Sequence, residues 1–388
     1  MLTPARRRTA QYVVKISKYC NLRCTYCYEF AELGRKHRMS LEQIATMLRH
    51  AAEHAEANQL ESIDFVWHGG EPFLVPIEIY ESIGELQREI FGERVACQNV
   101  VQSNLTVLTD RHVELLRSQR FFQGLGVSFD VYGDQRVDTK GQLRTDTVLK
   151  NIERLIEAEI PFGVITVLAR NTLPHARAIY RFFDSLGLRC RFLPFYLSAE
   201  DSQINVHALT FEEMVRTLND IFDDWLASEK ATTVHPVQEH LEVAIDVMAG
   251  AQRIPYDKLA DEIVFLVNTD GSVHGTADAY NPHHAYGNIF KEPVDTILSS
   301  PGRVRAAAEA DERYQRYCGQ CPFKAHCPGH FVVDATPEQR KMLAESGCPL
   351  RAAVEHVIKR VDETGLGSLL PERAAAGQSK TPALATLL

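Results

Sequence analysis

Short apolar runs alternate with amphipathic stretches along the N-terminal half of the chain. The runs are rich in Val, Ile and Phe, which is typical of strands buried on both faces. Between them, apolar residues recur at the three- to four-residue spacing of helices that pack against a sheet. The expected strands are Tyr12–Ile16, Ile63–Trp67, Asn99–Gln102, Leu125–Phe129, Gly163–Leu168 and Cys190–Phe195.

The stretches between these strands carry helix signals. Ser40 and Gln43 have the spacing of a capping box, which predicts a helix that begins at Leu41. Successive βα units imply parallel strands with right-handed crossovers. The region is too short for the eight units of a complete barrel, so the pattern predicts a partial (βα)6 barrel over residues 1–209. The other expected helices are Pro76–Ile90, Thr109–Arg117, Asp146–Glu157 and Leu173–Leu186.

The pattern changes from Thr210 onward. Residues 210–260 are expected to form a helical linker region, and residues 261–362 a small α+β domain. The Asp270-Gly271 pair predicts the turn of a hairpin, and residues 363–388 are expected to form a flexible tail. The expected elements are helices Phe211–Ser228, Pro236–Gly250 and Arg351–Val361, hairpin strands Ile263–Val267 and Ser272–His274, and a turn-rich segment Tyr314–Leu350.

Charge and composition narrow the function classes. The 388 residues include 42 Lys and Arg against 51 Asp and Glu, so the formal net charge is -9. This acidic balance disfavours a protein that binds a nucleic-acid backbone. No apolar stretch is long enough to span a membrane, and the basic N-terminus is not followed by a signal-peptide core. A cytoplasmic protein with no membrane or nucleic-acid partner is expected.

The nine cysteines form two groups at opposite ends of the chain. An odd number without an export signal disfavours a disulfide framework and favours metal or redox chemistry. Cys97 and Cys190 stand alone and are expected to be small buried apolar residues. The two groups are Cys20, Cys24 and Cys27, and Cys318, Cys321, Cys327 and Cys348.

The first group has the spacing CxxxCxxC on a loop just past the first strand. A loop can turn three sulfurs toward one cluster, whereas a strand points alternate side chains apart. Three thiolates are one fewer than the four that close a [4Fe–4S] cluster, so one iron is left open. A structural zinc site is the competing interpretation, but it usually has four ligands.

This loop, with the aromatic Tyr26 before its last cysteine, resembles the cluster loop of the radical S-adenosylmethionine (SAM) superfamily. The resemblance implies a partial (βα)6 barrel and a [4Fe–4S] cluster whose open iron binds SAM. It further implies reductive cleavage of SAM to a 5′-deoxyadenosyl radical.

Other segments resemble the SAM-binding motifs of that family. Gly69-Gly70-Glu71-Pro72 resembles the GGEP motif at the SAM amino group. The usual D-G-P segment is shortened after Asp130, so Arg136 is expected either to contact the SAM carboxylate or to be a surface charge. The residues that the resemblance assigns to cofactor binding are Tyr26, Gly69, Gly70, Glu71, Gln102, Asn104, Ser128, Asp130 and Arg136.

The second cysteine group has the pattern CxxC-x5-C-x20-C, which can close one [4Fe–4S] cluster or a tetrahedral zinc site. Behind a radical SAM barrel it resembles a SPASM domain, which carries auxiliary clusters. A full SPASM domain has seven cysteines and two such clusters. Here Phe331 stands where one expected cysteine would be, and residues 191–317 contain no cysteine. We therefore expect one auxiliary cluster; replacement ligands from His274, His283 and His284 are the alternative.

The resemblance also implies a reaction. SPASM-type enzymes mostly act on peptides, and the first 30 residues resemble cyclophane-forming maturases, which join an aromatic ring carbon to a Cβ in a ribosomally made precursor peptide. Asp278 aligns with a proposed general base in related sulfatase-maturating enzymes. Alternatives are a thioether-forming or epimerising maturase, an anaerobic sulfatase-maturating (formylglycine-forming) enzyme, and a non-enzymatic iron–sulfur or zinc scaffold.

The expected partners are a precursor peptide and an external electron donor such as flavodoxin or ferredoxin. Because the first strand starts near residue 11, no fused N-terminal domain for peptide recognition is expected. A separate leader-recognition protein is then a possible further partner.

Overall fold

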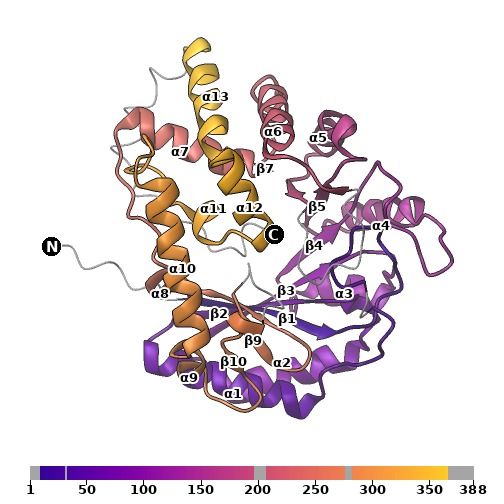
Figure 1. The fold of residues 1–388 in the computed structure, drawn as a ribbon. Helices are drawn as coiled ribbons and strands as arrows, with labels where there is room; N and C mark the ends of the chain where they lie inside the picture. Colours follow the sequence, from indigo (N-terminus) through magenta and orange to yellow (C-terminus); the bar gives the residue numbers. More distant parts are fainter. Residues whose placement is uncertain (1–8, 31–32, 196–206, 276–281, 366–388) are drawn as a thin grey trace.

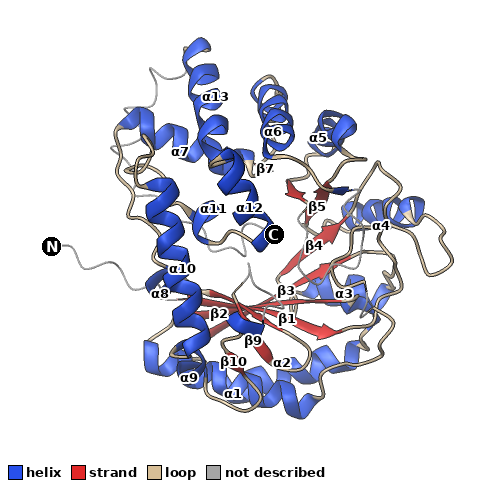
Figure 2. Cartoon of the chain, in the orientation of Figure 1, coloured by secondary structure: helices blue, strands red, loops and turns tan. Residues whose placement is uncertain are grey.

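The computed structural model describes residues 9–30, 33–195, 207–275 and 282–365. Its strands form one sheet in the order β10-β9-β8-β1-β2-β3-β4-β5-β6-β7, which Figure 2 shows in red. The strands are β1 (Thr9–Ser17), β2 (Ser62–Gly69), β3 (Ala96–Ser103), β4 (Gly124–Ser128), β5 (Gly163–Leu168), β6 (Cys190–Pro194), β7 (Val234–His235), β8 (Val264–Val267), β9 (Ser272–His274) and β10 (Gly287–Asn288).

Strands β1 to β6 are parallel neighbours in chain order and alternate with helices, which confirms the predicted succession of βα units. Ser40 caps α1 through the expected box with Gln43. A short 3-10 turn, Leu173–His175, precedes α5 where one longer helix was expected. The helices of this part are α1 (Leu41–Asn58), α2 (Ile77–Phe91), α3 (Asp110–Ser118), α4 (Thr145–Glu157) and α5 (Ala176–Ser185).

The two faces of the sheet differ in chemistry. On the face toward α2, Tyr12 stacks on Phe65, and Phe65 contacts Phe91 with ring centres 6.2 Å apart. Because side chains alternate along a strand, Lys15 and His68 lie on the opposite face, where they pair in register. We call this opposite face, which Figure 1 shows turned toward α11 and α12, the polar face because it carries Lys15 and His68, although Val13 and Val66 also lie on it.

The C-terminal half extends the same sheet. Strands β8 and β9 form the predicted antiparallel hairpin, and β8 also pairs in parallel with β1. Helix α13 packs against α6 and α7 (Figure 1). The helices of this half are α6 (Phe211–Leu226), α7 (Val237–Ala249), α8 (Lys258–Asp261), α9 (Val294–Leu298), α10 (Pro301–Cys318), α11 (His330–Val333), α12 (Pro337–Ser346) and α13 (Pro349–Glu363).

The segment Tyr314–Leu350, expected to be turn-rich, has turns between α10 and α11 but is also helical over much of its length. Helix α10 runs to Cys318, and α12 lies within the segment behind a capping box formed by Thr336 and Gln339. Helix α10 was missed because its buried side is made of small residues such as Ala306 and Ala310, which give a weak apolar pattern. None of the helices that the structure describes is long and apolar enough to cross a membrane.

A buried ionic network ties the C-terminal segments together. The Glu262 carboxylate accepts from Lys258 Nζ at 2.8 Å, Arg303 Nε at 3.1 Å and the Tyr286 hydroxyl at 3.0 Å. Lys258 also contacts Asp334, the C-cap of α11, at 2.7 Å. The Glu262, Lys258 and Arg303 side chains are each less than 8% exposed, and Asp334 is 27% exposed, so the network joins α8, α10 and the end of α11 through largely buried charges.

Replacing Glu262 by Gln should lower the free energy of unfolding by about 3 kcal/mol, because removing one member of a buried ionic network leaves its partners uncompensated. Urea titration followed by circular dichroism measures this change. The exposed Glu85 provides the matched control, and Glu85→Gln should leave stability within about 0.5 kcal/mol of wild type. Equal midpoints for the two variants would contradict a stabilising role for the network.

Candidate functional site

The first cysteine group lies on the loop between β1 and α1. Cys20 and Cys24 are buried, and Cys27 is partly buried. Main-chain hydrogen bonds hold the loop at both ends: Cys20 N donates to Leu33 O at 3.2 Å, and Cys27 N donates to Cys24 O at 3.1 Å. The loop is thereby folded back on itself, as gathering three thiols requires.

The surroundings of these sulfurs suit a bound iron–sulfur cluster. Burial raises the pKa of Cys20 and of Cys27 to about 12, so thiolates here need a cationic partner. Two side-chain donors point at sulfur: Asn104 Nδ2 lies 3.6 Å from Cys20 Sγ, and Arg136 Nη1 lies 3.9 Å from Cys24 Sγ. Three thiols with donors aimed at two of them fit a cluster that has three protein ligands. No group of three or more His, Cys, Asp or Glu side chains in the described ranges is close enough together to hold a single metal ion.

The two glycines after β2 lie against the main chain of the cysteine loop. A Cβ on Gly69, whose φ is +115°, would lie 2.4 Å from Ser17 O, and one on Gly70 would lie 2.3 Å from Tyr19 O. Gly70 N and Glu71 N also donate to these two carbonyls, at 2.8 and 2.9 Å. The absence of side chains at the pair therefore lets the end of β2 approach the cysteine loop.

Glu71 is fully buried and fixed by three donors. Its Oε1 accepts from Phe73 N and from the Ser103 hydroxyl, both at 2.8 Å, and its Oε2 accepts from Asn104 N at 2.7 Å. Burial raises the Glu71 pKa to about 6. A carboxylate can accept about four hydrogen bonds, so the side chain retains capacity for one more donor such as an ammonium group.

Gln102 and Ser128 lie on the polar face of the sheet. Gln102 Nε2 donates to Ser128 Oγ at 2.7 Å, while the buried Gln102 Oε1 has no hydrogen-bond partner among the described residues. Gly126 leaves room for this amide, because a Cβ there would lie 1.9 Å from Oε1. A buried acceptor without a donor is costly, and a bound ligand can supply one.

Asp130 joins two of the other predicted cofactor-binding residues. Its Oδ2 accepts from the Tyr26 hydroxyl at 2.5 Å and from Arg136 Nε at 2.9 Å. Its Oδ1 accepts from Thr166 Oγ1 and Val167 N, at 3.0 and 2.8 Å. Arg136 is only 7% exposed, so the alternative that it is a surface charge was wrong.

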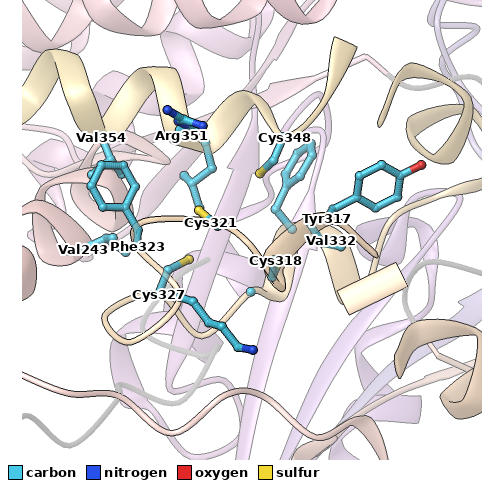
Figure 3. A pocket seen from close by; sticks show the side chains of 14 residues that line it. Val243, Tyr317, Cys318, Cys321, Phe323, Cys327, Val332, Cys348, Arg351 and Val354 are labelled. Carbon is cyan, nitrogen blue, oxygen red and sulfur yellow. The ribbon is translucent and has the colours of Figure 1, made fainter. Parts of the chain in front are cut away.

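The four cysteines of the second group line one pocket (Figure 3). Cys318 ends α10, Cys321 and Cys327 lie on the turns that follow, and Cys348 is the N-cap of α13. Burial raises the pKa of Cys318 to about 12 and that of Cys348 to about 11. The pocket is otherwise mostly apolar; its remaining lining residues are Val243, Tyr317, Phe323, Lys324, Gly329, Phe331, Val332, Leu350, Arg351 and Val354.

Of the residues linked to a second auxiliary cluster, Phe331 lines the four-cysteine pocket, whereas His274 and His284 do not. Phe331 packs on Phe211 with ring centres 5.6 Å apart. His284 Nε2 is 3.2 Å from Glu309 Oε1, and His274 Nδ1 is 3.5 Å from the Asn268 amide. Asp278, the candidate general base, falls outside the described residues.

Sequence reasoning missed several groups at this edge of the sheet. Ser103 and Thr166 hold the carboxylates of Glu71 and Asp130, and a Ser or a Thr at a strand end carries no sequence signal of that role. Lys15 could have been noticed, because it is a charged residue within an otherwise apolar strand.

Comparison with known proteins agrees with this arrangement. Residues 14–183 match the model of the radical SAM superfamily, so the chain contains a radical SAM domain. Such a domain implies SAM and a [4Fe–4S] cluster as cofactors.

Two curated relatives are sulfatase-maturating enzymes. The serine-type anaerobic sulfatase-maturating enzyme of Klebsiella pneumoniae is 24% identical over 321 residues, which cover 81% of this chain and 79% of the relative. The cysteine-type anaerobic sulfatase-maturating enzyme of Clostridium novyi is 25% identical over 218 residues, or 54% of this chain and 57% of the relative.

Solved structures share the fold over most of the chain. Native anSMEcpe with bound AdoMet and Cp18Cys peptide matches with a TM-score of 0.72 at 20% identity, covering 94% of this chain and 99% of that one. Streptococcus suis SuiB bound to precursor peptide SuiA matches with a TM-score of 0.57 at 14% identity, covering 88% and 74%. These matches confirm the predicted α/β fold class over most of the chain.

Replacing Gly70 by Ala should displace the cysteine loop, because the new methyl group would meet the Tyr19 carbonyl. The iron content after anaerobic reconstitution should then fall to about four irons per chain, which is the content of the one remaining cluster. Gly34→Ala is the control: its Cβ meets only a guanidinium nitrogen of Arg23, at 3.8 Å. Full iron content in the Gly70 variant would show that the loop tolerates the shift.

Proposed function

We propose that this protein is a radical SAM enzyme that oxidatively cross-links a ribosomally made precursor peptide, most specifically by forming a cyclophane between an aromatic ring carbon and a Cβ. The observation that carries the proposal is a radical SAM domain on the same chain as four further cysteines that line one pocket. The radical SAM domain supports hydrogen abstraction as the reaction class. The four further cysteines support a net oxidation.

The proposed ligand sets are the two cysteine groups of the sequence. Cys20, Cys24 and Cys27 would hold the first cluster, and Cys318, Cys321, Cys327 and Cys348 the auxiliary one. When bound, the first cluster and SAM supply a 5′-deoxyadenosyl radical that abstracts hydrogen from the substrate.

The residues proposed to hold SAM lie at the carboxyl ends of successive parallel strands. Glu71 offers a fixed, buried acceptor for an ammonium group, and Gln102 Oε1 a buried acceptor that needs a donor. Asp130 orients the Arg136 guanidinium, which would then face a carboxylate. Asn104, Ser128 and Tyr26 complete the proposed set through their contacts with Cys20, Gln102 and Asp130.

The C-terminal pocket supports an electron-transfer role. Its four thiols satisfy every iron of one cluster, so that cluster would be closed to substrate and suited to accept or relay an electron. A cross-link requires the loss of two electrons and two protons, and Asp278 is the proposed base for one proton. Flavodoxin or ferredoxin is the proposed reductant. A separate protein that binds the leader peptide is a possible further partner.

Formylglycine formation is the second candidate function. The sulfatase-maturating relative from Klebsiella pneumoniae aligns with 81% of this chain, which favours it. The four-cysteine C-terminal group counts against it, because those enzymes ordinarily carry two auxiliary clusters. Thioether formation and epimerisation are further alternatives within the peptide-modifying class.

Cys24→Ala should abolish formation of 5′-deoxyadenosine from SAM under reducing conditions, because one of three cluster ligands is lost. Chromatography of the reaction measures the product, and Cys97→Ala, outside both groups, should retain wild-type levels. Continued SAM cleavage by the Cys24 variant would refute the assignment of the loop.

Wild-type protein should contain about eight irons per chain, and Cys327→Ala about four. The Cys327 variant should still cleave SAM but should not complete the net oxidation of peptide. About twelve irons in wild type would contradict a single auxiliary cluster, and zinc with little iron would contradict the enzyme assignment.

If a short peptide is encoded beside the gene, co-expression with it should lower the peptide mass by about 2 Da per cross-link. Serine oxidation to formylglycine gives the same loss, so hydrazine trapping must follow. A cross-link does not react, whereas an aldehyde forms a hydrazone. Aldehyde formation on the Cp18Cys peptide would favour the sulfatase-maturating alternative.

A further inference from the structure

An ion pair buried beside the cysteine loop belongs to none of the proposed ligand sets. Lys15 lies on β1, and its Nζ contacts Oε1 of Glu29, two residues past Cys27. The two side chains are 2% and 6% exposed. Taking both charges out of water costs free energy, and the contacts of the pair indicate its role at this position.

The Lys15–Glu29 pair holds the C-terminal end of the cysteine loop against the sheet. Besides contacting Glu29, the Lys15 ammonium lies 4.9 Å from the centre of the Tyr28 ring, a cation–π distance. One side chain of β1 thus contacts the two residues that directly follow Cys27. The main chain adds a further tie, from Phe30 N to Cys27 O at 3.1 Å. The position of Cys27 therefore depends on the contacts of Lys15 as well as on the hydrogen bond within its own turn.

The neighbouring groups define the charges near Cys27. His68 faces Lys15 across β1 and β2; burial, followed by the nearby Lys15 charge, lowers the His68 pKa to about 4. His68 Nδ1 accepts from Gly69 N at 2.7 Å, as a neutral imidazole does. Lys15 interacts electrostatically with Glu29, Cys27 and Lys18, and Glu29 with Cys27.

We propose that Lys15 is a positioning residue that fixes Cys27 through Glu29 and, with Glu29, sets the reduction potential of the cluster held by Cys20, Cys24 and Cys27. This inference rests on the proposed function of that loop. Nearby fixed charge and the groups around ligand sulfurs tune iron–sulfur potentials. Since a reduced cluster carries one more negative charge, an unbalanced cation beside Cys27 favours reduction, and an unbalanced carboxylate opposes it.

The two members of the pair therefore predict shifts of opposite sign. Lys15→Met removes a positive charge from beside Cys27 and should lower the midpoint potential. Glu29→Gln removes a negative charge and should raise it. The Lys15→Met/Glu29→Gln double variant removes both charges, so its potential should lie between those of the single variants. A pair that only stabilises folding would give no such pattern.

The test is a redox titration of the full-length, anaerobically reconstituted protein, followed by electron paramagnetic resonance. The signal that changes when SAM is added identifies the first cluster and separates it from the auxiliary one. Lys36→Met, at an exposed position past the loop, is the matched control and should keep the wild-type potential. Single variants that also keep it would overturn the inference.

Iron content resolves the case in which Lys15→Met is damaged. Loss of only the SAM-responsive signal, with about four irons retained, supports the positioning role. If that variant does not fold, the Glu29→Gln shift decides: a raised potential supports the inference and an unchanged one overturns it. Wild-type protein without a SAM-responsive signal would instead refute the proposed function.

Discussion

The close approach of the β2–α2 turn to the main chain of the cysteine loop is the contact on which the candidate site depends. Gly70 N and Glu71 N donate to Ser17 O and Tyr19 O, and the absence of side chains at Gly69 and Gly70 allows the backbones to meet. This contact fixes the start of the cysteine loop. It also carries Glu71 beneath the loop, where Asn104 binds both the carboxylate and the region of Cys20.

Local sequence signals were enough for the barrel, because strand periodicity and capping boxes are determined by neighbouring residues. They could not reveal contacts between distant segments. The pairing of β8 with β1 joins residues about 250 positions apart, and the Lys15–Glu29 pair depends on how the loop folds back. Helix α10 was missed for another reason: its packing relies on alanines and on Arg303, whose partner Glu262 could not be identified from the sequence.

For the candidate site as well, sequence motifs indicated residues but not the contacts between them. The cysteine spacing and the GGEP segment predicted site residues far apart in the sequence, and the structure joins Glu71 and Cys20 through Asn104. What the sequence could not give was the hydrogen-bond partner of each group. Asp130, for example, was expected to face a ligand, yet its carboxylate is already bound by four donors from Tyr26, Arg136, Thr166 and Val167.

The pairing of β8 with β1 has a consequence for how the chain folds. Strand β1 is made first, yet one of its edges acquires its neighbour only after residues 264–267 have been synthesised. Until then that edge presents unpaired backbone groups, which favour association with other chains. Because closing such a distant contact is slow, we expect the nascent barrel to depend on chaperones, and truncation before β8 to yield aggregation-prone protein.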